Sequence, residues 1–395
     1  MERIDESKET TQPNFFLPHH PVTREDSSTT KVRVVFDASC KGTNGISLND
    51  AICCKNVSSN TAGSSRHTTA PDILAIFSFG IVSVYELKTV TYGTTSAPFL
   101  ATRVLQKLAE DERENYPAAA KATCEDFYVD DLYSGADTVE NAAVLRHQLD
   151  SMFSSAGMQL RKWASNSHAA LEGVPQADRA LQSLVDLDKD QSIITLGLHW
   201  EPSTDKLKYV IRNEHLEIRT TITKRAVLSR IAKLFDPLGL VGPVVLDAKI
   251  FMQTLWTLKE KNGKPWDWDH ELPQTMIESW NSYRSQLISL NDLRIDRFIS
   301  CPSPRSLELH LFSDASQLAY GCCCYLRSAS ASGKTRVALL TSRSKVAPLK
   351  QQTIPRLELC GARMAAELYV KVRDALRIID TTYFWVDSKF VLSWL

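Results

Sequence analysis

The sequence lacks the features that would assign it at once to a basic nucleic-acid-binding class or a zinc-binding class. Its 46 lysines and arginines balance 46 aspartates and glutamates, so the net charge gives no indication of a nucleic-acid partner. Its nine cysteines form no Cys-x-x-Cys pair and no cysteine–histidine ligand spacing, so we expect neither a structural zinc nor a disulfide framework. Without such a framework, a reducing compartment is expected.

Long apolar runs are also absent. The longest, residues 238–246, is interrupted by Pro243 and is too short to span a bilayer. The start of the chain is polar and charged, unlike a secretory signal peptide. We therefore expect a cytoplasmic protein without a membrane partner, and the sequence leaves a nuclear location open.

What the sequence does contain is a globular composition with locally uneven charge. Its length of 395 residues suggests two or three domains. Residues 221–265 hold eight lysines and arginines against three acids, and residues 327–363 hold eight against one. Such stretches could bind phosphates, and each could equally be a solvated helix face.

Hydrophobic periodicity predicts an α+β fold. We expect helices at 97–111, 142–153 and 224–234, and strands at 31–37, 193–200 and 207–211. From residue 307 the order becomes strand, strand, strand, helix, strand, which is typical of a mixed sheet. These elements are expected at 307–312, 321–326, 337–342, 355–377 and 383–387.

Two adjacent aspartates, Asp130 and Asp131, lie in a strand–turn–strand pattern at residues 127–134. Both carboxylates can approach one site only at a tight turn, because neighbours in a regular strand point to opposite faces. At about 4 Å and an effective dielectric of about 20 they repel by roughly 4 kcal/mol, which a divalent cation such as Mg²⁺ would reverse. The alternative is an exposed hairpin with an acidic tip.

Three further acids follow predicted elements of the C-terminal region. Asp314 follows the strand at 307–312, Glu358 lies near the start of the helix, and Asp387 closes the last strand. Acids far apart in sequence can converge on a pair of metal ions when such elements pack together. Each acid alone is more often an exposed side chain or a helix cap.

Several of these patterns resemble motifs of reverse transcriptases. Residues 127–131 resemble the polymerase motif in which a Tyr-x-Asp-Asp hairpin holds catalytic metal. Residues 91–99, with Gly93, look like the motif that opens a helix beneath the incoming nucleotide. Residues 160–166 look like the motif that carries the palm lysine, here Lys162.

Other segments extend the resemblance along the chain. Residues 29–39 resemble the fingers, where Arg33 would contact the triphosphate, and residues 195–200 resemble the primer grip. Residues 223–240 are similar to the BEL/Pao region between polymerase and RNase H. The three C-terminal acids resemble the retroviral-type RNase H triad.

The resemblance implies the pol polyprotein of a BEL/Pao-type retrotransposon, with RNA-directed DNA polymerase and RNase H activities that use Mg²⁺ or Mn²⁺. Asp130 and Asp131 would bind metal in the first site, and Asp314, Glu358 and Asp387 would bind it in the second. The implied partners are an RNA template, a DNA primer, dNTPs, an RNA–DNA hybrid and other element-encoded proteins. A virus-like particle is then an expected location besides the cytoplasm.

The implied organisation has four parts. A disordered tail (1–15) precedes an incomplete fingers and palm region (16–166). A primer-grip and thumb or connection-like region (167–300) leads into a truncated RNase H-like α/β domain (305–395).

The sequence departs from the family pattern in two places. The first palm aspartate belongs between residues 50 and 92, where the chain has 41 residues and Asp72 is the only aspartate. We expect an internal deletion there, with residues 71–77 forming the helix before the lost strand. The chain also stops eight residues after Asp387, before the family's fourth RNase H acid. Both activities are therefore expected to be impaired, and the alternatives are a non-catalytic nucleic-acid-binding remnant or a relic without function.

Overall fold

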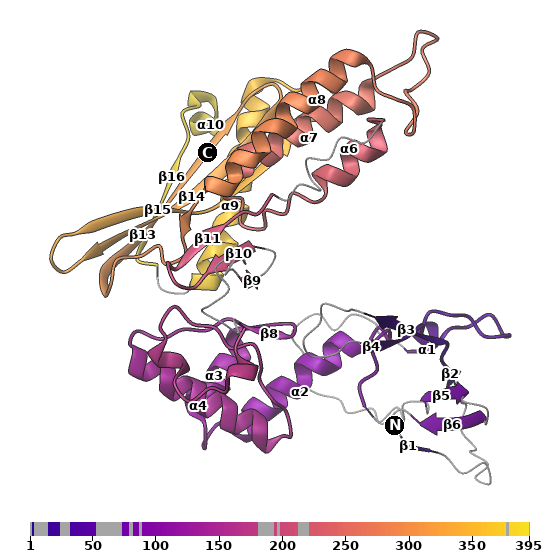
Figure 1. Ribbon diagram of the computed structural model, residues 1–395. Coiled ribbons are helices and arrows are strands. Elements are labelled where there is room, and N and C mark those ends of the chain that lie inside the picture. Colours follow the sequence, from indigo (N-terminus) through magenta and orange to yellow (C-terminus); the bar gives the residue numbers. More distant parts are fainter. Residues whose placement is uncertain are drawn as a thin grey trace. The chain divides into compact units, whose positions relative to one another are not determined.

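The computed structural model describes most of the chain as two compact units (Figure 1). The described residues are 2–3, 15–23, 32–52, 73–78, 82–86, 89–180, 193–195, 198–211, 221–376 and 379–394. The N-terminal unit comprises Met1–Arg161 with Ala169–Glu172, and the C-terminal unit comprises Lys162–His168 with Gly173–Leu395. Both units mix helices and strands, which confirms the predicted fold class. Within the described residues, no helix combines the length and apolarity needed to cross a bilayer.

The N-terminal unit begins with strands. A four-stranded sheet has the order β1-β6-β5-β2, formed by Glu2–Arg3, Val82–Glu86, Ile73–Ser78 and Phe15–Phe16. Strands β3 (His19–Thr23) and β4 (Val32–Phe36) pair antiparallel, and a short helix α1 (Leu48–Ala51) follows.

One expectation for this region is wrong. We expected residues 71–77 to form a helix, but 73–78 form β5, and Leu74–Ser78 of it pair with β6. The physical reason is that cross-strand pairing outside the local window decides the backbone conformation. The disordered tail expected over residues 1–15 stays a prediction: Glu2–Arg3 pair with β6 and Phe15 pairs with Ile73, and the other residues of that range lie outside the described part.

The rest of the N-terminal unit is mainly helical. Its elements are α2 (Ala97–Asp111), α3 (Pro117–Glu125), β7 (Phe127–Tyr128), β8 (Asp131–Leu132), α4 (Val139–Ser155) and η1 (Ala169–Leu171). The hydroxyl of Thr138 accepts a hydrogen bond from the backbone N–H of Asn141 and caps α4. Phe153 of α4 stacks on Phe127 of β7 at 5.7 Å between ring centroids. This contact packs the start of the β7–β8 hairpin, which carries Asp130 and Asp131, against the helices.

In the C-terminal unit, a small sheet and a group of helices precede a larger sheet. The small sheet has the order β12-β11-β10-β9, formed by Ile295–Asp296, Lys206–Lys208, Leu198–Glu201 and Ile193–Thr195. The helices are η2 (Gln176–Asp178), α6 (Lys224–Ile231), α7 (Gly242–Thr257), α8 (Gln274–Gln286) and η3 (Leu287–Asp292). Helices α6 to α8 share a core that includes the fully buried Val227, Leu255 and Trp280.

The larger sheet contains β13 (Pro304–Ala315), β14 (Ala319–Ser330), β15 (Thr335–Val346) and β16 (Thr381–Trp385) in the order β15-β14-β13-β16. Helix α9 (Ile354–Leu376) lies between β15 and β16 in sequence, so the predicted order of elements is correct, and α10 (Lys389–Trp394) follows. Met364 and Leu368 of α9 pack on Leu309 and Leu311 of β13, and this apolar contact holds the helix on one face of the sheet.

The loop before α7 fastens the helices to the edge of this sheet. The backbone N–H of Ser342 in β15 donates to the carbonyl of Leu238 at 2.9 Å, and the Ser342 hydroxyl donates to the carbonyl of Gly239 at 2.5 Å. Asp236 holds the same loop by accepting hydrogen bonds from Tyr209 and from the backbone of Leu240. The helical region and the sheet are therefore joined by direct backbone contact.

Candidate active site

Three carboxylates meet at one end of the larger sheet. Strands β13 and β16 are parallel, and their register pairs Phe312 with Trp385. Asp314 and Asp387 each lie two residues beyond that pair, so the carboxyl ends of both strands bring them to the same place. Glu358, near the start of α9, completes the group, and potential ligand atoms of the three residues all lie within 4.8 Å of one another.

The electrostatic environment of Glu358 is unfavourable without a cation. Asp314 and Asp387 are exposed, whereas Glu358 is only 7% exposed. Its Oε2 atom has no hydrogen-bond partner within the described part of the chain. Burial, followed by the charges of Asp387 and Asp314, raises the pKa of Glu358. An unpaired buried carboxylate is costly, and a bound cation would remove both the desolvation penalty and the repulsion.

This donor set fits a divalent cation of the magnesium type. Hard cations prefer carboxylate oxygens and retain water and substrate oxygens as further ligands. Two exposed carboxylates leave such an ion open to solvent, while the buried one fixes its position. The cluster can therefore hold one or more divalent ions next to a phosphate group.

The hairpin that carries Asp130 and Asp131 has the expected tight turn. Tyr128 pairs with Asp131, and Val129 and Asp130 form the two-residue connection. Val129 has a φ of 57°, a value that a β-branched residue rarely adopts. Both aspartates are exposed, and the Tyr133 hydroxyl donates to Asp131 at 3.1 Å.

A third acid does not join this hairpin among the residues that the structure describes. Within that part of the chain, the only group of three or more potential metal ligands is the one formed by Asp314, Glu358 and Asp387. Asp72, the only aspartate in the interval where the first palm aspartate belongs, lies outside the described residues. The hairpin therefore offers two carboxylates, and its role as a metal site stays a prediction.

The backbone of Gly93 packs closely against the backbone of Phe36. Its φ is +96°, and a Cβ atom there would lie 2.1 Å from the carbonyl oxygen of Phe36. The side chain of Asn49 bridges the same loop, since its amide donates to the carbonyl of Gly93 at 3.2 Å and accepts from the N–H of Thr95 at 2.9 Å. Sequence reasoning missed Asn49, because one amide in a turn-rich run carries no distinguishing signal.

The other two predicted nucleotide contacts are exposed cations in different units. Arg33 lies on β4, opposite Val22 of β3 in the N-terminal unit. Lys162 belongs to the C-terminal unit and has a positive φ of 59°. Their proposed roles at a polymerase site remain predictions.

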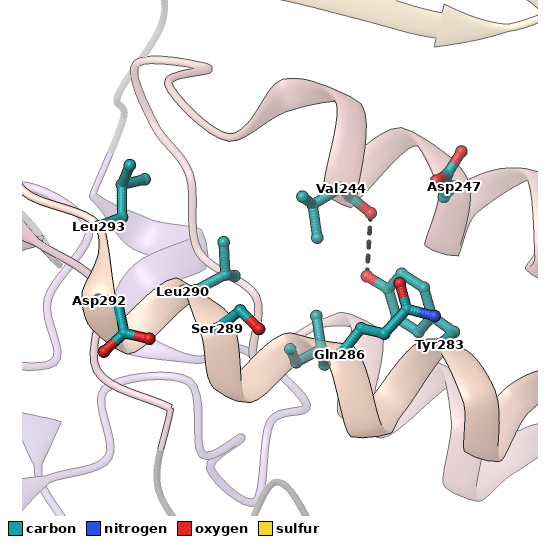
Figure 2. Close-up of a pocket in the computed structure, with 9 residues that line it drawn as sticks. Val244, Asp247, Tyr283, Gln286, Ser289, Leu290, Asp292 and Leu293 are labelled. Atoms are coloured by element: carbon teal, nitrogen blue, oxygen red, sulfur yellow. Dashed lines mark hydrogen bonds between the residues drawn. The ribbon is translucent and has the colours of Figure 1, made fainter.

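A separate pocket of about 460 Å³ lies between α7, α8 and η3 (Figure 2). The Tyr283 hydroxyl donates to the carbonyl of Val244 at 2.9 Å, and burial together with the charge of Asp247 raises the pKa of Tyr283 to about 12. None of the predicted site residues lines this pocket.

Comparison with known proteins finds a similar family for the segment of the chain that contains the acidic cluster. Residues 223–388 match the family model described as a Pao retrotransposon-like RNaseH-like domain. The match begins at the residue that caps α6 and ends directly after Asp387, so it contains all three acids of the cluster. No curated protein matches the sequence significantly.

Solved structures of foamy viral proteins are similar to this chain at low sequence identity. A foamy viral protease-reverse transcriptase, dRH, in complex with dsDNA has a TM-score of 0.51 and 14% sequence identity. The similarity covers 96% of this chain and 60% of that one, so this chain spans about three fifths of its length. A second structure, the foamy viral protease-reverse transcriptase in complex with dsDNA, has a TM-score of 0.47 and 15% identity over 96% of this chain and 71% of that one. The chain therefore has a reverse-transcriptase-like fold, and its residues 223–388 are similar to a retroelement RNase H-like domain.

Proposed function

We propose that this chain belongs to a BEL/Pao-type retrotransposon pol polyprotein and that its acidic cluster is an RNase H site with impaired cleavage of the RNA strand of RNA–DNA hybrids, since the resemblance identifies only three of the family's four acids in this sequence. The observation that carries the proposal is the convergence of Asp314, Glu358 and Asp387 inside the segment that matches the family model. The buried oxygen of Glu358 supports it, because this atom has no hydrogen-bond partner among the described residues and a bound cation would supply one.

The three acids would hold Mg²⁺ or Mn²⁺. When bound, such ions lower the pKa of an attacking water and stabilise the oxygens of the phosphodiester. Glu358 fixes the position of the site from the buried side. Asp314 and Asp387, which are exposed, leave the opposite side open to a large substrate.

Basic residues that precede Glu358 in the sequence favour a nucleic-acid partner. Lys345, Lys350 and Arg356 are exposed and lie in the segment that leads from β15 to Glu358. Cations along such a path neutralise phosphates. The similar foamy viral structure is a complex with dsDNA, which agrees with this partner class.

For the polymerase half, we infer impaired activity. The resemblance implies metal binding by Asp130 and Asp131 and contacts from Arg33, Gly93 and Lys162 to a dNTP on an RNA template and DNA primer. The inference rests on the sequence, in which Asp72 is the only aspartate between residues 50 and 92, where the resemblance expects the first palm aspartate. The alternative function is nucleic-acid binding without polymerisation.

A hybrid-cleavage assay tests the proposal. The purified chain is incubated with end-labelled RNA annealed to DNA and with Mg²⁺, and the RNA products are resolved by length. Cleavage should disappear in Asp314→Asn and Glu358→Gln, and it should persist in Asp374→Asn, a matched loss of an exposed acid at the other end of α9. Salt-sensitive hybrid binding without cleavage would favour the non-catalytic alternative.

A further inference from the structure

Helix α9 lies unusually close to the sheet one turn after Glu358. A Cβ atom built on Gly361 would lie 3.3 Å from the carbonyl oxygen of Asp314, 3.4 Å from that of Gly321 and 3.6 Å from the Cβ of Ser313. Two of these neighbours are backbone atoms, which cannot swing aside as a flexible side chain can. The contact therefore joins the helix that carries Glu358 directly to the strand that carries Asp314.

Gly361 is not required for its backbone conformation. Its φ lies outside the left-handed range, so any L-residue could adopt it. Glycine in a helix interior is less favourable than alanine. A buried glycine at this point therefore has a packing reason, which is the space between the helix and the two carbonyl groups.

We propose that Gly361 is a positioning residue that sets the spacing between Glu358 and Asp314 and thereby the size of the cation that the cluster accepts. This inference rests on the proposed metal-dependent function. Glu358 and Gly361 are three residues apart, so they lie on the same side of the helix. A change in helix–sheet distance at Gly361 therefore moves Glu358 relative to Asp314.

The size of the expected movement matters for magnesium. A methyl group at this position requires its neighbours to move by a few tenths of an ångström. Mg²⁺ needs near-octahedral geometry at about 2.0–2.1 Å, whereas Ca²⁺ accepts more flexible geometry at about 2.3–2.6 Å. A small widening of the cluster should therefore weaken Mg²⁺ binding more than Ca²⁺ binding.

The test compares the two cations in the full chain. Dissociation constants for Mg²⁺ and for Ca²⁺ are measured by calorimetry for the wild type, Gly361→Ala and Gly361→Val, and unfolding is followed in urea without metal. Gly135→Ala, where nothing lies within 4 Å of the added carbon, is the control for the alanine variant. Ala366→Val, an exposed position on α9, is the control for the valine variant.

We expect the Kd for Mg²⁺ to rise about tenfold in Gly361→Ala, with a clearly smaller rise for Ca²⁺ and no loss of metal-free stability. If Gly361 has a purely structural role, the metal-free stability should fall and the Kd values for Mg²⁺ and Ca²⁺ should rise by the same factor. That result would overturn the inference. An unchanged ratio of the two constants in Gly361→Ala would overturn it as well, even if Gly361→Val fails to fold. If the wild type binds no Mg²⁺, the proposed function fails at that step, and the spacing role fails with it.

Discussion

Gly239 and Ser342 are in direct backbone contact although 103 residues separate them. A Cβ atom on Gly239 would lie 2.1 Å from the carbonyl oxygen of Ser342, and the Ser342 hydroxyl donates to the Gly239 carbonyl. Through this contact, the loop that precedes α7 covers the β15 edge of the larger sheet. An otherwise open sheet edge is a site for unwanted pairing, so this loop also protects the fold.

Replacing Gly239 by alanine should therefore destabilise the C-terminal unit by about 3 kcal/mol, since the added carbon meets a backbone oxygen that cannot move freely. The measurement is urea unfolding, with one m-value (the dependence of the unfolding free energy on urea concentration) fitted for all variants. Gly263→Ala is the matched control, because Gly263 has a similarly positive φ of +82° with nothing within 4 Å. Equal losses in the two variants would assign the effect to backbone strain alone and contradict the contact.

The stability of the metal-free protein should depend on pH through Glu358. Burial and the neighbouring acids raise the pKa of Glu358 in the folded state, so the folded chain binds this proton more tightly than the unfolded chain does. The free energy of unfolding should therefore fall as pH rises from about 4.3, the ordinary glutamate value, through the raised value, and then level off. Glu358→Gln should remove this component, and Mg²⁺ should reverse the loss in the wild type. A wild-type pH profile identical to that of Glu358→Gln would argue against a buried charge at this position.

Primer extension should be absent or very weak in the wild-type chain, because the interval between residues 50 and 92 is too short for the palm segment that carries the first catalytic aspartate in the family it resembles. The assay uses a DNA primer on an RNA template with dNTPs and Mg²⁺, and Asp130→Asn is compared with the wild type. Extension that is present in the wild type and lost in Asp130→Asn would show a working polymerase and contradict this expectation.

Asn49→Ala should loosen the loop at Gly93. The substitution leaves the carbonyl of Gly93 and the N–H of Thr95 without the bonds that the Asn49 side chain now makes. Because both hydrogen bonds are exposed to solvent, we expect a loss of only about 1 kcal/mol. Hydrogen exchange at the Thr95 amide should accelerate accordingly. Asn115→Ala, which removes an exposed amide that bonds only to nearby Glu112 in the described structure, is the control and should leave this exchange rate unchanged.

Local sequence patterns determined much of the secondary structure. The predicted bounds of α2, residues 97–111, agree with the structure, because an apolar stripe and a proline in the first turn define that helix within a short window. The alternating strands and the long helix of the larger sheet were predicted for the same reason. Helix α7 was missed, since an apolar run without a polar face gives no helical period, and α3 was missed as a short alanine-rich segment.

The sequence by itself supplied the identities and the order of Asp314, Glu358 and Asp387, since residue type and spacing are properties of the chain. Their meeting at one point, the burial of Glu358 and the strand at residues 73–78 were decided only by tertiary structure. Each of these depends on contacts between segments far apart along the chain. The 103-residue contact of Gly239 with Ser342 and the packing of Gly361 on Asp314 have the same origin, because steric fit between backbones exists only after the elements have been brought together.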